Sequence, residues 1–158
     1  MTAQGTALLV RWATRWDREP AIQLMAALAD QHEVSTDLDT LREAFEFALR
    51  NPEEYRFAFA ERDRQIIGMA ALHRSYTSWH GRLRGTIEDV YVVEEARRSG
   101  AATALFEFLH GEARRRGYWS LSLDVLESNE SARAFYERFG MKNSGYLVYE
   151  MELGTEEG

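Results

Sequence analysis

A chain of 158 residues that is 45% apolar and 28% charged is long enough for one hydrophobic core, so we expect a single domain over 1–158, with 154–158 as a frayed tail. Its apolar runs are too short to cross a bilayer and its N-terminus lacks the pattern of a signal peptide, so a cytoplasmic protein without a membrane partner is expected. The absence of cysteine excludes disulfides, thiolate metal sites and a cysteine nucleophile, and we expect no metal; the net charge of −7 argues against a nucleic-acid partner and favours cationic ligands.

The first third of the chain predicts a strand and two helices. Leu8–Trp12 is a short apolar run typical of a strand. Asp17 is a candidate N-cap for a first helix with proline in its first turn. A second helix is predicted to begin near Thr36 or Asp37 and to end at Asn51-Pro52, because proline disfavours the helical conformation of the residue before it.

The middle of the chain has the period of two that is typical of strands. Strands are predicted over Arg56–Glu61 and Gln65–Ser75, joined by a turn at Asp63-Arg64. A polar and aromatic loop is predicted over Tyr76–Gly85, and a strand rich in β-branched residues over Thr86–Val93.

The last third predicts two further strand and helix pairs. A long helix covers Arg98–Gly117, a strand Trp119–Leu126, a short helix Asn129–Gly140 and a last strand Tyr146–Leu153. Strands separated by helices indicate an α/β or α+β fold. We therefore expect a mixed sheet with helices on both faces and one right-handed parallel crossover around the long helix.

The turn before the long helix is a candidate anion site. Arg97-x-x-Gly100-x-Ala102 places two residues with little or no side chain where the helix begins. The first amides of a helix have no partner within it, and with the helix dipole they suit a pyrophosphate. The pattern alone is weak, so an ordinary basic turn leading into a helix remains the alternative.

The short helix carries the second pattern, which has an aromatic face. The residues that share this face by helical spacing are Ala132, Phe135, Tyr136 and Phe139. Asn129 or Ser128 can cap the helix. A tyrosine at such spacing is more often part of a core than catalytic, and the neighbouring phosphate turn favours the functional interpretation.

Together these segments resemble the GNAT superfamily of acetyl-CoA-dependent N-acetyltransferases. The family's Arg/Gln-x-x-Gly-x-Gly/Ala motif is matched by Arg97, Gly100 and Ala102, and its later motif by Asn129, Ala132, Phe135-Tyr136 and Gly140. The resemblance implies a mixed, mostly antiparallel sheet of six to seven strands. It also implies that Thr86–Val93 and Trp119–Leu126 splay apart and hold the cofactor between them.

The resemblance implies acetyl-CoA as cosubstrate and assigns roles to particular residues. The expected cofactor contacts are Tyr91, Val92, Arg97, Arg98, Ser99, Gly100, Ala101, Ala102, Thr103 and Asn129. A bulge would free the amide of Val92 to bind the thioester carbonyl, and Tyr136 would be the general acid for the leaving thiolate. Since the chain has no cysteine, direct transfer in a ternary complex is favoured over an acyl-enzyme.

A narrower resemblance, to the diamine (spermidine/spermine-type) acetyltransferases and their thialysine-acetylating relatives, lies in Trp79-x-Gly81 and the following Glu88-Asp89 strand. Trp79 is a candidate for stacking on a cationic amine. Glu88 and Asp89 are adjacent on a strand, so their side chains should leave opposite faces. We favour Glu88 as amine-binding carboxylate and general base, directly or through water, with His80 as the alternative base. A surface carboxylate pair is the structural alternative.

The function indicated is acetyl transfer from acetyl-CoA to a primary amine of a small polyamine- or diamine-like cation. One alternative keeps the reaction and changes the acceptor to an amino-acid side chain, an aminoglycoside or a protein N-terminus. Another is a non-catalytic module that binds acyl-CoA, because fold does not determine function. The resemblance also makes a homodimer possible.

Overall fold

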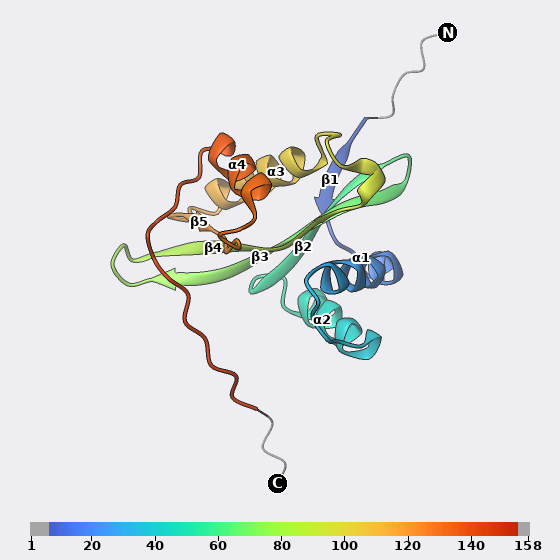
Figure 1. Cartoon of the computed structure of the whole chain (residues 1–158), viewed down its shortest axis with the longest axis horizontal. Helices are drawn as coiled ribbons and strands as arrows, with labels where there is room; N and C mark the ends of the chain where they lie inside the picture. Colours follow the sequence, from blue (N-terminus) through green and yellow to red (C-terminus); the bar gives the residue numbers. More distant parts are fainter. Residues whose placement is uncertain (1–6, 155–158) are drawn as a thin grey trace. The chain divides into compact units, whose positions relative to one another are not determined.

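The computed structural model describes residues 7–154, which contain five strands and four α-helices (Figure 1). The chain divides into two compact units, the first ending at Asp124 and the second beginning at Val125. Within the described residues, no helix is long and apolar enough to cross a membrane. The predicted frayed tail lies outside the described residues except for Gly154.

The first unit is built on one mixed sheet. Its strands stand in chain order: β1 (Leu9–Trp12), β2 (Tyr55–Arg62), β3 (Gln65–Thr77), β4 (Arg82–Val92) and β5 (Leu121–Ser122). All neighbours are antiparallel except β4 and β5, which are parallel and connected through α3 (Ala101–Arg115). The mixed, mostly antiparallel sheet is confirmed, whereas six to seven strands is wrong because five are formed in the described chain.

Two helices precede β2, close to their predicted positions. They are α1 (Arg18–Gln31), which follows a short 3₁₀ turn η1 (Arg15–Asp17), and α2 (Leu38–Arg50). Asp37 caps α2 as predicted, since its carboxylate accepts a hydrogen bond from the amide of Thr40 at 2.8 Å.

Asp17 has a different role from the predicted cap. Its buried carboxylate accepts two hydrogen bonds from the Arg11 guanidinium, each at 2.8 Å, and one from the Thr14 amide at 2.7 Å. Its side chain makes no capping bond to α1. The bidentate pair with Arg11 is stronger than a cap, so Asp17 connects β1 to the start of α1 instead.

The two faces of the sheet differ in residue size. One face presents Phe57, Phe59 and Met69 to α1 and α2. The other carries small residues below α3, namely Ala58, Ala60, Gly68 and Ala70. A Cβ on Gly68 would lie 3.3 Å from Leu105 of α3, so the helix packs very close to the sheet. Figure 1 shows α3 on one side of the sheet and α1 and α2 on the other.

The predicted loop Tyr76–Gly85 is mostly wrong. Tyr76 pairs with Leu83 and Thr77 with Arg82, so β3 and β4 form a long hairpin whose turn covers only residues 78–81. The polar and aromatic residues that suggested a loop are the exposed side chains of this hairpin.

The second unit contains α4 (Glu130–Phe139), which matches the predicted short helix. Asn129 caps it, accepting a hydrogen bond from the Ala132 amide at 3.2 Å, and Gly140 ends it at φ +104°. Residues 141–154 form no strand, so the predicted strand Tyr146–Leu153 is wrong for this structure.

In the first unit, the predicted strand Trp119–Leu126 is reduced to β5, because only Leu121 and Ser122 pair with β4.

Candidate active site

The turn that opens α3 leaves its amides free. Gly100 adopts the left-handed conformation at φ +88° and no side chain caps the helix. The first intrahelical bond there runs from the Ala104 amide to the Gly100 carbonyl, at 3.0 Å. The amides of Ala101, Ala102 and Thr103 donate to no group among residues 7–154. The turn therefore has the unpaired donors that an anion site needs.

The space beside Gly100, which precedes these amides, is also open. A Cβ built on Gly100 would meet no atom within 4 Å. Arg98, at φ +63°, is exposed, and its guanidinium has no partner in the described part of the chain. The Ser99 hydroxyl donates to the Ala96 carbonyl, so it stabilises the turn itself.

Arg97 is directed away from this position. Its Nε donates to the Val92 carbonyl at 3.2 Å and another nitrogen donates to Gln31 at 3.3 Å, while the guanidinium lies 5.9 Å from the centre of the Tyr91 ring. Arg97 thus fixes the end of β4 beside α1. Of the two predicted arginines, Arg98 has its charge available.

β4 has a long open edge toward β5. The parallel ladder contains only the pairs Gly85 with Leu121 and Thr86 with Ser122, and β4 continues to Val92. The Val93 amide donates to Ile67 of β3 at 2.9 Å. Because successive amides of a strand point to opposite edges, the Val92 amide is directed to the open edge. The short ladder agrees with the expected splay.

A bulge interrupts β4 upstream of Val92. Met69 pairs with Tyr91 and Ala71 with Glu88, so Asp89 and Val90 together stand opposite Ala70. Asp89 takes the left-handed conformation at φ +52°. The bulge that the resemblance implied is confirmed, but it lies at Asp89-Val90, while Val92 is in register with Gly68.

This bulge brings two carboxylates to one phenol. The Tyr55 hydroxyl donates to the Asp89 carboxylate, and burial together with Asp89 and Glu88 raises the pKa of Tyr55 far above its usual value. Both carboxylates therefore act on the Tyr55 phenol. The prediction that the Glu88 and Asp89 side chains leave opposite faces of the sheet is wrong, because the left-handed conformation of Asp89 breaks the alternation of side chains along β4. His73 Nδ1 lies 3.7 Å from Glu88 Oε1, and the Glu88 side chain is 40% exposed.

Trp79 and His80 lie elsewhere on the hairpin. Trp79 is 86% exposed in the turn, and the His80 ring stacks on Trp119 at 3.9 Å. Glu88 comes six positions after Arg82 along β4, which is roughly 20 Å of strand. The structure therefore does not bring these two side chains to the carboxylates.

The two predicted site residues of the second unit are Asn129, which caps α4, and Tyr136, which lies on α4. The Asn129 oxygen is occupied by its cap bond. Tyr136 is half-buried, beside Phe135 at 5.6 Å between ring centres, and burial raises the pKa of its phenol above 10. The phenol is therefore neutral, and a proton donor, at physiological pH.

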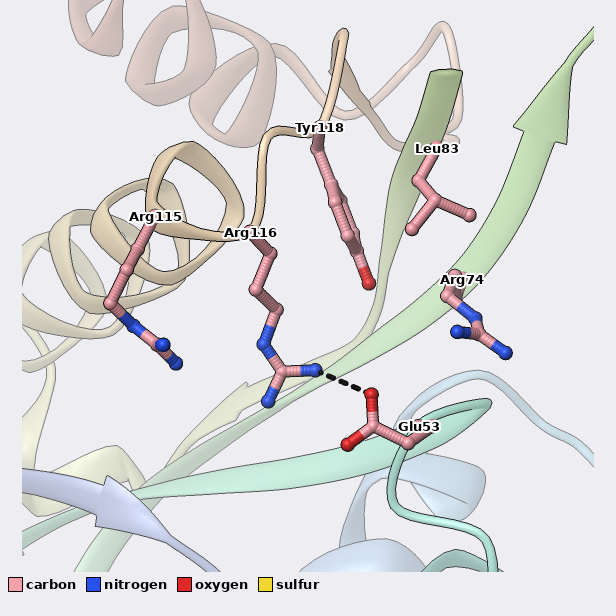
Figure 2. A pocket seen from close by; sticks show the side chains of 6 residues that line it. All are labelled: Glu53, Arg74, Leu83, Arg115, Arg116 and Tyr118. Carbon is pink, nitrogen blue, oxygen red and sulfur yellow. Dashed lines mark hydrogen bonds and ion pairs between the residues drawn. The ribbon is translucent and has the colours of Figure 1, made fainter. Parts of the chain in front are cut away.

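A cavity of about 380 Å³ near the C-terminal end of α3 was not anticipated (Figure 2). Its lining comprises Glu53, Arg74, Leu83, Arg115, Arg116 and Tyr118. Each arginine has a carboxylate partner: Arg116 with Glu53 at 3.2 Å, Arg115 with Glu112 at 2.7 Å, and Arg74 with Glu54. No predicted site residue lines this cavity, and its Arg116–Glu53 ion pair connects the end of α3 to the loop before β2.

Comparisons with known proteins agree with this arrangement. The model of the acetyltransferase (GNAT) family matches residues 10–141. An aminoalkylphosphonate N-acetyltransferase of Salmonella typhimurium is 27% identical over 138 residues, which cover 87% of this chain and 86% of that protein. A thialysine N-epsilon-acetyltransferase of Caenorhabditis elegans is 25% identical, covering 85% of each chain. Among solved structures, a predicted acetyltransferase of Clostridium acetobutylicum with acetyl-CoA has a TM-score of 0.76 at 20% identity, covering 93% of this chain and 97% of that one.

Proposed function

Because the chain belongs to the acetyltransferase (GNAT) family and is therefore an acyltransferase, we propose that it transfers an acetyl group from acetyl-CoA directly to a primary amine of a small cationic acceptor. The observation that carries this proposal is the set of unpaired amides opening α3 beside the open edge of β4.

These features fit the two polar parts of the cofactor. A diphosphate suits the amides of Ala101, Ala102 and Thr103, where the helix dipole and Arg98 supply positive charge. The amides of the pantetheine arm suit the unpaired edge of β4. When bound, acetyl-CoA supplies a thioester, and the Val92 amide would polarise its carbonyl.

Glu88 and Asp89 give the acceptor amine a negatively charged site. An alkyl amine has a pKa near 10.4, so about one molecule in a thousand is nucleophilic at neutral pH. The carboxylates bind the cation, and Glu88, which is partly exposed, takes its proton directly or through water. Asp89 is held by Tyr55 and shapes the site.

Tyr136 completes the proposed reaction as general acid. Glu88 passes the proton of the bound ammonium to solvent before the amine attacks. As the C–N bond forms and the C–S bond breaks, Glu88 takes the second amine proton and the phenol proton goes to the departing thiolate. With a pKa near 8.5 the released thiol stays protonated at neutral pH, and the phenol regains its proton from solvent. The raised pKa of Tyr136 keeps its proton available.

Two observations favour a small acceptor over a protein. The two relatives described above are named for small amines, aminoalkylphosphonate and thialysine. The protein is acidic and carries adjacent carboxylates at the bulge, which suits a cation. A polyamine or diamine remains our proposed class, and cytoplasmic location and homodimer formation remain predictions.

The test is a thiol-release assay with acetyl-CoA and a panel of acceptors: polyamines, diamines, lysine-like amines, an aminoalkylphosphonate, an aminoglycoside and a peptide with a free N-terminus. We expect the highest kcat/KM with a small diamine or polyamine. A higher kcat/KM with the peptide or the aminoglycoside would contradict the proposed acceptor and assign the enzyme to that acceptor class instead. Calorimetric binding of acetyl-CoA without transfer to any amine would indicate the non-catalytic module instead.

A further inference from the structure

The cavity at the end of α3 contains a buried hydroxyl group that has no hydrogen-bond partner among residues 7–154. The group belongs to Tyr118, which is 8% exposed. Figure 2 shows the hydroxyl directed into the cavity, toward the space between Arg116 and Arg74. Buried polar side chains in folded proteins nearly always have a partner, so the unpaired phenol favours a ligand in this cavity.

The lining of the cavity is positively charged, although the chain has a net charge of −7. Three of the six described residues that line it are arginines. A fourth, Arg56, forms no ion pair in the described part of the chain, and its guanidinium lies 4.4 Å from the centre of the Trp12 ring. Burial lowers the pKa of Arg56, and the charges of Arg116 and Arg115 lower it further. The guanidinium groups therefore repel one another, and an anion between them would be stabilised.

The carboxylates that pair with two of these arginines are more exposed than the arginines themselves. The Glu53 side chain is 66% exposed and that of its partner Arg116 only 18%. The Glu54 side chain is 54% exposed and that of its partner Arg74 is 29% exposed. Both glutamates belong to the turn before β2. Ion pairs with an exposed partner contribute little to stability, so a stronger anion can displace these carboxylates while the arginines stay in place.

The arrangement suits a phosphate group better than a carboxylate. A guanidinium group binds phosphate through two parallel hydrogen bonds. A phosphate dianion has enough oxygens to accept from two guanidinium groups and a phenol at once, whereas a carboxylate has two oxygens and one charge. The volume of about 380 Å³ is within the range of small-molecule sites, and Leu83 with the Tyr118 ring adds an apolar wall. A small phosphate monoester therefore fits as well as the free ion.

The cavity is separate from both parts of the proposed acetyl-transfer site, and all its lining residues belong to the first unit. Arg74 alternates with Ala70 and Leu72 on β3, so it is on the face that α3 covers. Glu88 pairs with Ala71, which belongs to the opposite face. Because α3 has 15 residues, its end lies about 22 Å from its first turn.

We propose that this cavity is a binding site for a phosphate dianion, either free or as part of a small monoester. The Tyr118 phenol and the guanidinium groups of Arg74 and Arg116 donate hydrogen bonds to its oxygens. Glu53 and Glu54 turn toward solvent when it binds. This inference goes beyond the proposed reaction and does not depend on it.

The first test is calorimetric titration of the full chain at pH 8, where a phosphate monoester carries about two negative charges. The probes are inorganic phosphate, phenyl phosphate and acetate. We expect phosphate to bind and acetate to bind at least tenfold more weakly. Tighter binding of phenyl phosphate would identify a monoester as the ligand, and equal or tighter binding of inorganic phosphate would identify the free ion. Failure of both phosphates to bind, or acetate binding as tightly as phosphate, overturns the proposal.

The second test locates the bound phosphate with matched variants. Tyr118→Phe removes only the unpaired hydroxyl, so it should weaken binding about tenfold while the free energy of unfolding stays equal or rises. Arg74→Gln should weaken binding at least tenfold, whereas Arg98→Gln, which removes the same charge from the turn before α3, should leave it unchanged. Wild-type affinity in Tyr118→Phe, or a loss in Arg98→Gln as large as in Arg74→Gln, would place the phosphate elsewhere and overturn the cavity as its site.

The third test concerns displacement of the carboxylates. Glu53→Gln removes the charge that competes with phosphate for Arg116, so phosphate should bind about twofold to fivefold more tightly. Glu43→Gln, at an exposed position of α2, makes the same change in net charge and should leave the affinity unchanged. Equal affinities in these two variants would show that Glu53 does not compete with phosphate, which contradicts the proposed site.

Discussion

The Tyr55 hydroxyl donates a hydrogen bond to the carboxylate of Asp89, a residue on β4 two strands away across β3. The bond reaches Asp89 because the bulge places this residue at φ +52° and turns its side chain toward the face that carries Tyr55. It joins the start of β2 to the site at which we propose that the amine binds. The aromatic residue thereby supports the geometry of both carboxylates.

Replacing Tyr55 with phenylalanine should destabilise the protein and weaken the acceptor site. Loss of a hydrogen bond to a half-buried carboxylate costs about 1.5–3 kcal/mol in free energy of unfolding. Urea unfolding measures this loss, and the KM for the amine should rise in the same variant. Tyr76→Phe, at an exposed phenol of the hairpin, is the control and should change neither quantity. Equal effects of the two substitutions would contradict the role given to Tyr55.

Replacing Glu88 with glutamine should lower kcat/KM by about 100- to 10,000-fold at neutral pH, in the range of a general base. The activity that remains should keep rising with pH toward about 10.4, because the amine then loses its proton without help. Initial rates from pH 6 to 10 measure this profile. Glu94→Gln, at an exposed carboxylate of η2 (Glu94–Ala96), should retain the wild-type profile. If the Glu88→Gln variant also had the wild-type pH profile, Glu88 would be excluded as the general base.

Thr103 offers a sharp test of the diphosphate site, because it is exposed in the first turn of α3. Thr103→Asp places a negative charge that the helix dipole favours, yet it repels a diphosphate. We expect unchanged or higher thermal stability together with at least a tenfold rise in the KM for acetyl-CoA, about 1.4 kcal/mol. Thr103→Asn is the isosteric neutral control and should bind normally. Equal KM values for the two variants would place the diphosphate elsewhere.

Tyr136→Phe should lower kcat by about 10- to 1,000-fold and leave the KM for acetyl-CoA nearly unchanged, as expected for loss of a general acid. Steady-state kinetics with a good acceptor give both values, and calorimetry confirms cofactor binding. Tyr76→Phe again provides the control. A wild-type kcat in the Tyr136→Phe variant would exclude this phenol as general acid. Tyr136 would then have only the packing role that its position on the aromatic face of α4 also suits.

Asp17→Asn should lower the free energy of unfolding by about 1.5–3 kcal/mol, because the charge-assisted hydrogen bonds to the buried carboxylate are lost and Arg11 keeps only Glu61 as an ionic partner. Hydrogen bonds from Arg11 and Thr14 lower the pKa of the Asp17 carboxyl below its unfolded value of 3.8. Its contribution is therefore complete above about pH 4 and is lost as pH falls through the lower folded value. Urea unfolding from pH 6 to 2.5 should show a shallower acid loss in the asparagine variant. Parallel curves would contradict the pair's role.

Local signals in the sequence predicted the helices and the open turn before α3. Asp37, Asn129 and Gly140 mark helix ends through their own side chains or conformations, so the predicted boundaries of α2 and α4 are close to those observed. The spacing of Arg97, Gly100 and Ala102 identified the open amides, although it did not show that Arg97 bonds to β4. Contacts with distant residues decide that detail, and a local motif does not contain them.

Strands were harder to predict because their partners are far away in the sequence. The residues around Trp79 look like a loop until Tyr76 pairs with Leu83. The sequence around Glu88-Asp89 does not indicate that Asp89 adopts the left-handed conformation. We therefore assumed the alternation of a regular strand, which predicts the two carboxylates on opposite faces. Tyr146–Leu153 has the pattern of a strand and forms none, because a local pattern does not identify the partner strand that a strand requires.

The alanines and the glycine beneath α3 determine how far the first turn of that helix, our proposed diphosphate site, stands above the sheet. A methyl group added at Gly68 would meet Leu105, the Tyr91 carbonyl and Val92 at 3.3 Å, and relief of that crowding would lift or tilt the helix together with its first amides. If the diphosphate binds at these amides as we propose, the affinity for acetyl-CoA depends on the thickness of a buried layer that lies beneath the site. Directed evolution aimed at altered coenzyme use would find adaptive changes in that layer, remote from every polar contact.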